Sequence, residues 1–185
     1  MPKSRSPTLI AAEPEAAERL ASLSRAAKLS YHDWAPPSWE PPSVAAERAR
    51  WQRRVVDPAG WTRIAADSVV ALGVIHFTDA RTERGEGTAI EGSAHLSGLF
   101  VLPASWGRGI GGALLEAALV EMRGRGYLKA QLFTAAANRR SRTFYERRGW
   151  QATLANTHRH DELWLVRYER SVGVDLDLTI QRVLD

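Results

Sequence analysis

Glycines are concentrated at the start of an apolar segment in the middle of the chain. The stretch SWGRGIGGALL occupies residues 105–115 and contains four glycines. Glycine costs about 1 kcal/mol relative to alanine inside a helix, so such a cluster needs a physical reason. Glycine amides beside a helix N-terminus bind anions, typically a pyrophosphate. We therefore expect an anion to lie against the backbone of the following residues: Gly107, Arg108, Gly109, Ile110, Gly111 and Gly112.

Two common nucleotide-binding motifs do not fit the residues around these glycines. The spacing G-x-G-x-x-G also occurs in dinucleotide-binding folds, which place an acidic residue about 20 positions later to hold a ribose. Here no Asp or Glu occurs between Glu121 and Glu146. The Gly-Lys-Ser/Thr sequence of a phosphate-binding loop is also absent. We still expect a phosphate-binding site here, but the kind of ligand has to be inferred from the neighbouring residues.

Composition narrows the chemistry further. The 185 residues carry a net charge of +4, which is low for a nucleic-acid-binding protein. Basic residues gather in the segments 139–142 and 146–148, as expected near a phosphate-bearing ligand. Cysteine is absent, which excludes disulfides and thiolate chemistry. The H-x-H pair of His158 and His160 lacks nearby further ligands, so we expect no metal.

The elements that must position these residues alternate along the chain, which predicts an α/β fold in one domain over residues 1–185. Residues 1–8 resemble a loose tail, and the Pro- and Trp-rich segment 30–42 and the polar segment 79–93 read as loops. Apolar periodicity and capping residues predict helices over 13–28, 44–56, about 110–124 and 138–148. Strands are expected over 8–11, 61–66, 69–77, 95–102, 128–134, 150–154 and 163–169, with a further edge strand over 174–185.

Two linked motifs resemble the GNAT superfamily of acyl-CoA-dependent N-acyltransferases. That family has a strand ending L-x-V-x-P, then Q/R-x-x-G-x-G/A, a helix, a strand and N-x-x-[SA]-x-x-x-Y-[EK]-x-x-G-[FW]. The resemblance covers residues 95–151 and departs at Trp106, which stands at the Q/R position. The residues that carry it are Leu99, Val101, Pro103, Gly109, Gly111, Asn138, Ser141, Tyr145, Glu146, Gly149 and Trp150.

The resemblance implies a fold and a cofactor site. The fold would be a central mixed, mostly antiparallel sheet, splayed at the cofactor site and flanked by helices. Acetyl-CoA would be the co-substrate, its pantetheine arm pairing with the main chain of Leu99, Phe100 and Val101 like an added strand. Residues 107–112 would hold its pyrophosphate, and Asn138 would bond the pantetheine or phosphate region. Asn138 and Tyr145 are seven residues apart, so they lie on one face of a helix.

The resemblance also suggests catalytic groups. Tyr145 could protonate the thiolate of the departing CoA. An amine acceptor must lose a proton before it attacks, which calls for a general base. Relatives that acetylate ribosomal N-termini carry a glutamate where this chain has Phe133, and other members carry a carboxylate where it has His95. We expect His95, with an ordinary pKa near about 6.5, to be the base. The lesser candidates are Glu91, His76, His158 and His160.

The predicted function is therefore N-acetylation of a primary amine on a small molecule or a protein, with acetyl-CoA as donor. The alternative is a non-catalytic acyl-CoA-binding regulatory module, suggested by the missing glutamate at Phe133. We expect the 30–42 loop and the turn around residues 158–161 to frame the acceptor site. No nucleic acid or membrane partner is expected, a homodimer stays open, and the lack of a secretory signal favours the cytoplasm. Carboxylates that could attract a cationic amine are Asp33, Glu40, Asp161 and Glu162.

Overall fold

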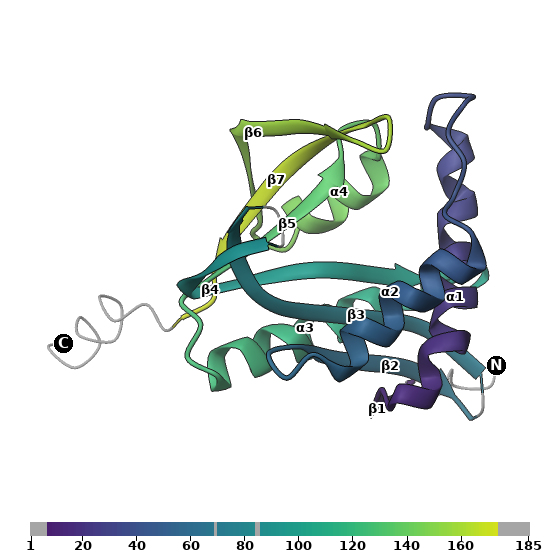
Figure 1. The fold of residues 1–185 in the computed structure, drawn as a ribbon, viewed down its shortest axis with the longest axis horizontal. Helices are drawn as coiled ribbons and strands as arrows, with labels where there is room; N and C mark the ends of the chain where they lie inside the picture. The colour runs from purple at the N-terminus through teal and green to yellow at the C-terminus, as the bar shows by residue number, and fades with distance from the viewer. Residues whose placement is uncertain (1–6, 69, 84–85, 174–185) are drawn as a thin grey trace, which may run out of the picture.

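A computed structural model describes residues 7–68, 70–83 and 86–173 of the chain, and Figure 1 shows its elements. Within these residues, seven strands form one sheet in the order β1-β2-β3-β4-β5-β7-β6. The strands are β1 (Thr8–Ala11), β2 (Trp61–Asp67), β3 (Val70–Glu83), β4 (Glu86–Val101), β5 (Lys129–Ala135), β6 (Gln151–His160) and β7 (Leu163–Ser171). The helices are α1 (Ala17–Leu29), α2 (Val44–Val56), α3 (Ile110–Gly124) and α4 (Arg139–Glu146), with short 3₁₀ turns at Pro14–Ala16, Ser30–Asp33 and Pro103–Ser105.

The sheet is antiparallel except at its centre, where β4 and β5 run parallel. This parallel pairing covers only Ser93–Leu96 against Lys129–Leu132. Beyond it, β4 pairs with β3 alone, and β5 pairs with β7 alone. The sheet therefore opens at this point, and Figure 1 shows β5, β6, β7 and α4 set apart from the layer of β2, β3 and β4. The predicted mixed, mostly antiparallel sheet that splays at its centre is confirmed.

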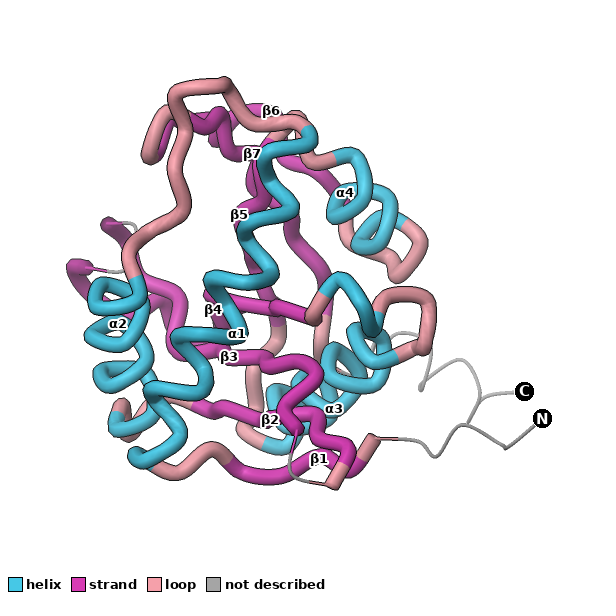
Figure 2. Tube along the Cα trace, turned by 90° about the vertical axis from the view of Figure 1, so that its right-hand side faces the viewer, coloured by secondary structure: helices cyan, strands magenta, loops and turns pink. Residues whose placement is uncertain are grey.

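Helices cover both faces of the sheet. Neighbouring residues of a strand point to opposite faces, so each strand contributes side chains to both helix layers. Ile64 packs with Leu20 of α1 and the fully buried Trp51 of α2. The next residue, Ala65, joins the larger core cluster on the other face, which includes Leu114 of α3. Figure 2 shows α1 and α2 on one side of the sheet and α3 on the other. The two helix layers fix the sheet edges that border the opening.

Most of the expected helices and strands occur within a few residues of their predicted ends, but three expectations were wrong in part. Residues 79–83 and 86–93 belong to strands instead of a loop: β3 and β4 continue as paired strands, with Asp79 opposite Ala94 and Glu83 opposite Glu86. Their side chains are mostly exposed, so the apolar alternation that reveals a half-buried strand is missing. The strand expected over 8–11 is β1, so the expected tail 1–8 was one residue too long: Thr8 pairs with Ala66. The 30–42 segment begins with the 3₁₀ turn Ser30–Asp33.

Other expectations fall partly or wholly outside the described residues. The edge strand expected over 174–185 lies entirely outside them, as does Val69 at the start of one expected strand. Among the helices of the described residues, none is both long and apolar enough to cross a membrane. Within the same residues, no group of three or more His, Cys, Asp or Glu side chains could hold a metal ion.

Candidate functional site

A β-bulge in β4 lies at the point where the sheet opens. Gly98 pairs with His76 of β3, whereas Leu96 pairs with Phe77, so Ser97 is an extra residue with no partner of its own on β3. A bulge of this kind bends the strand and redirects its side chains and carbonyl. The Ser97 carbonyl accepts a hydrogen bond from Nη2 of Arg54 at 2.8 Å. The bulge thus connects α2 to the opening.

The glycines expected to bind an anion surround the N-terminus of α3. Gly107 and Gly109 have φ of 77° and 79°, the left-handed region that L side chains rarely adopt. Gly109 is the N-cap residue of α3, no side chain caps this end, and no acid lies in its first turn. The first amides of α3 and the positive end of its dipole are therefore available to an anion. A Cβ on Gly107 or Gly109 would meet no atom of the chain within 4 Å, so the space before them is open.

The other two glycines of this segment lie next to side chains of the α4 region. A Cβ on Gly111 would lie 3.4 Å from the ring of Phe144, and one on Gly112 would lie 3.3 Å from Nη2 of Arg148. Both neighbours belong to the α4 region, which therefore packs closely on the start of α3. Arg148 also stacks over the Phe144 ring, 3.9 Å from its centroid. This contact holds basic side chains near the free amides of α3.

Asn138 and Tyr145 come from α4, as the sequence spacing predicted, and both line one cavity. Asn138 caps the helix, because its Oδ1 accepts a hydrogen bond from the amide of Ser141 at 3.0 Å. Tyr145 is only 8% exposed. Burial raises its pKa above the ordinary value, and the nearby Tyr31 contributes in the same direction. The phenol is therefore protonated at neutral pH, and the raised pKa makes it a weaker acid than a free tyrosine side chain.

Trp106, the residue that departs from the family pattern, has two contacts at the same place. Its indole Nε1 donates to the Val101 carbonyl at 2.9 Å. The guanidinium of Arg140 lies over its ring, with Cζ 3.6 Å from the centroid. The indole thereby holds the end of β4 in place and positions the guanidinium of Arg140 near the glycine segment. Trp106 takes part in the site through a side-chain contact to the backbone.

These features enclose what we call the first cavity, which has a volume of about 660 Å³. It lies between the open edge of β4, the start of α3 and α4. Nearly all of the residues that the sequence assigned to the cofactor line it, and Arg108, which forms an ion pair with Asp67 at 4.0 Å, does not. The predicted residues that line it are Leu99, Phe100, Val101, Gly107, Gly109, Ile110, Gly111, Gly112, Asn138 and Tyr145.

A second cavity, of about 630 Å³, adjoins the first. Tyr31 and Phe100 line both cavities and so stand at the junction between them. The outer rim of the second cavity comes from the 30–42 loop and the β6–β7 turn. Ser38 in the loop donates a hydrogen bond to Glu162 in the turn at 2.8 Å, which ties these two segments together. Rim residues from them include Trp39, Glu40, His160, Asp161 and Glu162.

His95 lines the second cavity and does not line the first. Its Nδ1 is buried and has no hydrogen-bond partner among the described residues. Burial lowers the pKa of His95 to about 4, Arg54 lowers it further, and a hydrogen bond with the backbone of Gln131 opposes the shift. The imidazole is therefore neutral at neutral pH, with a pKa well below the value expected from the sequence. Tyr145 and His95 thus lie in adjoining cavities on the two sides of Phe100.

The lesser base candidates have different surroundings. His76 is 1% exposed, and its Nδ1 lies 2.8 Å from Oγ1 of Thr62. Burial lowers the pKa of His76 to about 3, with Arg54 and His95 adding to the shift, so it is a core residue. Glu91 is exposed on the β3–β4 hairpin. The ring of His158 packs on Phe133, 5.0 Å between centroids, and Nε2 of His160 lies 3.3 Å from Oδ2 of Asp161.

The floor of the second cavity contains a polar cluster that sequence reasoning missed. Glu47 of α2 is fully buried and accepts hydrogen bonds from Lys28 at 2.5 Å and from Ser24 at 2.8 Å. Arg50 donates to the same carboxylate at 2.9 Å. A signal for it existed: Ser24 and Lys28 lie four residues apart on the apolar face of the first helix, beside Leu20 and Ala27.

Comparisons with known proteins agree with this geometry at the level of the fold. A search of curated protein sequences found no match. Among solved structures, the PaiA N-acetyltransferase from Thermoplasma acidophilum in complex with coenzyme A aligns with a TM-score of 0.68 and 17% identity, over 89% of this chain and 99% of that chain. An acetyltransferase from Thermus thermophilus aligns with a TM-score of 0.68 and 19% identity, over 90% of this chain and 97% of that chain.

The ribosomal-protein-S18-alanine N-acetyltransferase from Escherichia coli aligns with a TM-score of 0.62 and 16% identity, over 90% of this chain and 94% of that chain. At such identities the likeness concerns the fold alone. Residues 25–150 match the sequence profile of the acetyltransferase (GNAT) family, and this segment is more than half of the chain. It contains α2, α3, α4 and the strands around the opening. The chain therefore belongs to the GNAT family of acetyltransferases.

Proposed function

We propose that this protein transfers the acetyl group of acetyl-CoA to a primary amine. The observation that carries the proposal is the first cavity, where the open edge of β4, the uncapped start of α3 and the buried phenol of Tyr145 meet. Open space in front of Gly107 and Gly109 suits the approach of a pyrophosphate to their backbone. Arg139, Arg140 and Arg148 line the same cavity and suit the remaining phosphate of CoA.

The main chain of β4 suits the pantetheine arm. Leu99, Phe100 and Val101 pair with β3 on one side and line the first cavity on the other. An extended ligand can add to such an edge as if it were a further strand. Placed this way, the arm would run along β4 toward the bulge at Ser97, where the sheet opens. The thioester would then arrive near the junction of the two cavities.

The reaction follows from these positions. The neutral amine nitrogen attacks the carbonyl carbon of the thioester, and the bond from that carbon to sulfur breaks. The amine loses one proton to a base, for which His95 in the second cavity is our candidate. The thiolate gains one proton, for which the protonated phenol of Tyr145 is our candidate. Proton transfers of this kind contribute about 10²–10⁴-fold to a rate.

Release of free thiol from acetyl-CoA, measured with a panel of primary amines, tests the proposal. We expect turnover with at least one amine, and mass spectrometry should find the acetyl group on nitrogen. Tight binding of CoA without turnover of any amine would contradict the proposed activity and favour a regulatory acyl-CoA-binding role. Absence of CoA binding would contradict the assignment of the first cavity as well.

A further inference from the structure

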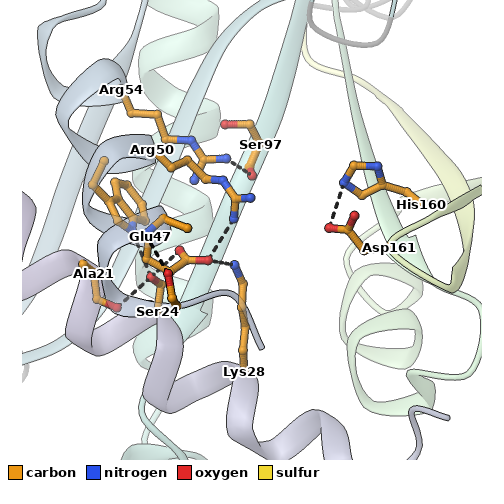
Figure 3. Close-up of polar contacts among 12 residues, drawn as sticks. Ala21, Ser24, Lys28, Glu47, Arg50, Arg54, Ser97, His160 and Asp161 are labelled. Carbon is orange, nitrogen blue, oxygen red and sulfur yellow. Dashed lines mark hydrogen bonds and ion pairs between the residues drawn. The ribbon is translucent and has the colours of Figure 1, made fainter. Parts of the chain in front are cut away.

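The floor of the second cavity carries more positive than negative charge. Lys28, Arg50 and Arg54 all line it. Figure 3 shows Lys28 and Arg50 bonded to Glu47, and Arg54 bonded to Ser97. Lys28 and Arg50 both form ion pairs with Glu47, at 2.5 and 2.9 Å. One carboxylate cannot neutralise three cations, so the floor keeps a positive excess.

Arg54 is the cation that lacks a carboxylate partner. In the described part of the chain it forms no ion pair, and its Nη2 bonds only the neutral carbonyl of Ser97. Its Nη1 is buried without a hydrogen-bond partner among the same residues. Burial lowers the pKa of Arg54 to about 10, with Arg50 adding to the shift, and the group stays charged at neutral pH. Its Cζ lies 4.9 Å from the centroid of the Trp51 ring. The charge of nearby Glu47 opposes the pKa shift, but this carboxylate is already paired with Lys28 and Arg50. A partly buried guanidinium without an anion of its own is costly, which points to an anion supplied by a ligand.

This unpaired cation lies at the reacting end of the proposed cofactor path. Arg54 is bonded to Ser97, the bulge residue at which the sheet opens. A Cβ on Gly98, the next residue, would lie 3.2 Å from Nη1 of Arg54, so the guanidinium packs directly on the strand. His95 and Ser97 line the same cavity. An anionic group held by Arg54 would therefore sit close to the atom that accepts the acetyl group.

Acidic side chains lie on the opposite side of the cavity and, within the residues that the structure describes, form no ion pair with Arg54. Glu40, Asp161 and Glu162 line the rim. Figure 3 shows His160 and Asp161 across from Lys28 and Arg50. Among the described residues, no ion pair joins a rim carboxylate to a floor cation. The cavity is thus positive at its floor and negative at its rim, which suits a ligand that carries both charges.

We propose that the acceptor is a small amine of the amino-acid type, with its carboxylate held beside Arg54 on the floor of the second cavity. The proposal rests on the function proposed above and names its substrate class. A cavity of about 630 Å³ is within the range of small-molecule sites. A peptide N-terminus has an amide where an amino acid has its carboxylate, and a polyamine has only cations. Both should be poorer acceptors at this floor.

Matched pairs of acceptors test the proposal directly. We suggest L-alanine with L-alaninamide, L-phenylalanine with L-phenylalaninamide, and β-alanine with its amide, plus spermidine and a short peptide with an N-terminal alanine. The quantity to compare is kcat/KM, calculated on the concentration of neutral amine, because an amide lowers the pKa of the neighbouring amine. We expect at least a tenfold preference for the carboxylate member of one or more pairs.

Variants then locate the preference. Arg54→Gln should reduce the ratio of carboxylate to amide kcat/KM to near one, while Arg53→Gln, on an exposed neighbour in the same helix, should leave it unchanged. The ratio compares two substrates on one preparation, so partial loss of folded enzyme does not alter it. If Arg54→Gln does not fold, Arg50→Gln supplies the same test, with a smaller decrease in the ratio expected.

The outcomes separate this proposal from the proposed function. Acetylation of spermidine, the peptide or the amides at rates equal to or above those of the amino acids would overturn the substrate class and leave the acetyltransferase function intact. A carboxylate preference that Arg54→Gln and Arg50→Gln both retain would overturn the placement at this floor. Failure of every amine to react would overturn the proposed function and this inference with it.

Discussion

Tyr145 is buried at the inner end of the first cavity, where its raised pKa keeps the phenol protonated. If it donates the proton to the departing thiolate, Tyr145→Phe should lower kcat by about 10²–10⁴-fold, because the proton donor is lost. The affinity for CoA should change little, since the ring is retained. Steady-state kinetics together with calorimetric titration of CoA would measure both quantities.

Tyr127→Phe is the matched control for this change. The Tyr127 hydroxyl donates to Asp79 at 2.5 Å, and the residue does not line either cavity. We expect this variant to keep kcat within about twofold. Equal turnover of Tyr145→Phe and the parent enzyme would remove the phenol from the mechanism.

The environment of His95 lowers its pKa to about 4, and this value predicts how activity should depend on pH. A base must be unprotonated, so activity should be present above this pKa and lost below it. The acidic limb of kcat/KM attributable to His95 should therefore lie well below the ordinary imidazole value of about 6.5. Since Arg54 contributes to the shift, Arg54→Gln should move the limb to higher pH.

His95→Gln provides the complementary measurement. The amide keeps a polar side chain of similar size but cannot take up a proton near neutral pH. If His95 is the base, the variant should lose its acidic limb and most of its kcat/KM. A folded variant that retains the limb at the same pH would assign the base to another group.

At the scale of elements, the start of α3 depends on the left-handed conformation of Gly109, with φ of 79°. Gly109→Ala should cost about 1–2 kcal/mol in the free energy of unfolding, because alanine is strained in this region. No atom of the chain lies within 4 Å of the new Cβ, so any steric effect should appear only with a ligand. We expect weaker CoA binding than the parent, measured by calorimetry, and a lower midpoint of urea unfolding.

Gly124→Ala is the control in the same helix. Gly124 lies at the last position of α3, has no positive φ, and has no neighbour within 4 Å of an added Cβ. Alanine there should be neutral or stabilising by up to about 1 kcal/mol, with unchanged CoA binding. Equal CoA affinity of the two variants and the parent would show that the ligand does not approach Gly109.

The contact between α1 and α2 depends on Glu47, which bonds Ser24, Lys28 and Arg50. Burial by itself would raise the pKa of Glu47, but the bonds from Lys28 and Ser24 and the charge of Arg50 outweigh it and leave the pKa below the ordinary value. Glu47→Gln should lower the free energy of unfolding by about 3–5 kcal/mol, because it leaves buried cations unpaired. Chemical denaturation at neutral pH measures this loss.

The same carboxylate gives a pH test with a definite sign. A carboxyl group whose pKa is lowered in the folded state adds stability above its unfolded pKa and loses it as pH falls through the folded pKa. The parent should therefore lose more stability than Glu47→Gln between neutral pH and acid. Glu18→Gln, which breaks only the exposed pair with Arg48, should change stability by less than about 1 kcal/mol.

Across the whole molecule, the two cavities differ in how far they could be predicted from the sequence. Most of the first cavity is built from two short segments, 99–112 and 137–148, and residues of the segment 27–34 complete it. The glycines, the capping Asn138 and Tyr145 of the two main segments have fixed local spacing. Residues that are close together in one short segment stay close together in the fold, so a sequence motif can reveal the site that they form.

The long β3–β4 hairpin was missed because its exposed side chains lack an apolar alternation.

The second cavity joins residues that are far apart in the sequence. Lys28 comes from α1, Arg54 from α2, His95 from β4 and Glu162 from the β6–β7 turn. In the sequence, Arg54 looks like the solvated charge that most surface helices carry, and Lys28 differs only by its place on the apolar face of the first helix. Their burial beside Glu47 follows only from the packing of α1 on α2. The proposed recognition of the acceptor is therefore the part that needed the structure.

The opening of the sheet also makes a prediction for the molecule as a whole. β4 and β5 share only a short parallel pairing, so the layer of β2–β4 and the group of β5–β7 with α4 are joined along a narrow line. A CoA molecule in the first cavity would contact both parts, through β4 and α3 on one side and α4 on the other. Binding to the folded state alone should stabilise it by about 2.7 kcal/mol at a CoA concentration 100 times Kd.

Differential scanning calorimetry with increasing CoA measures this stabilisation. We expect a single unfolding transition whose midpoint rises with the logarithm of CoA concentration, because both parts of the sheet unfold together when the ligand joins them. Hydrogen exchange should slow in β4 and α4 at the same time. Protection confined to α3, with α4 and β4 unchanged, would mean that the ligand binds the glycine segment without spanning the opening.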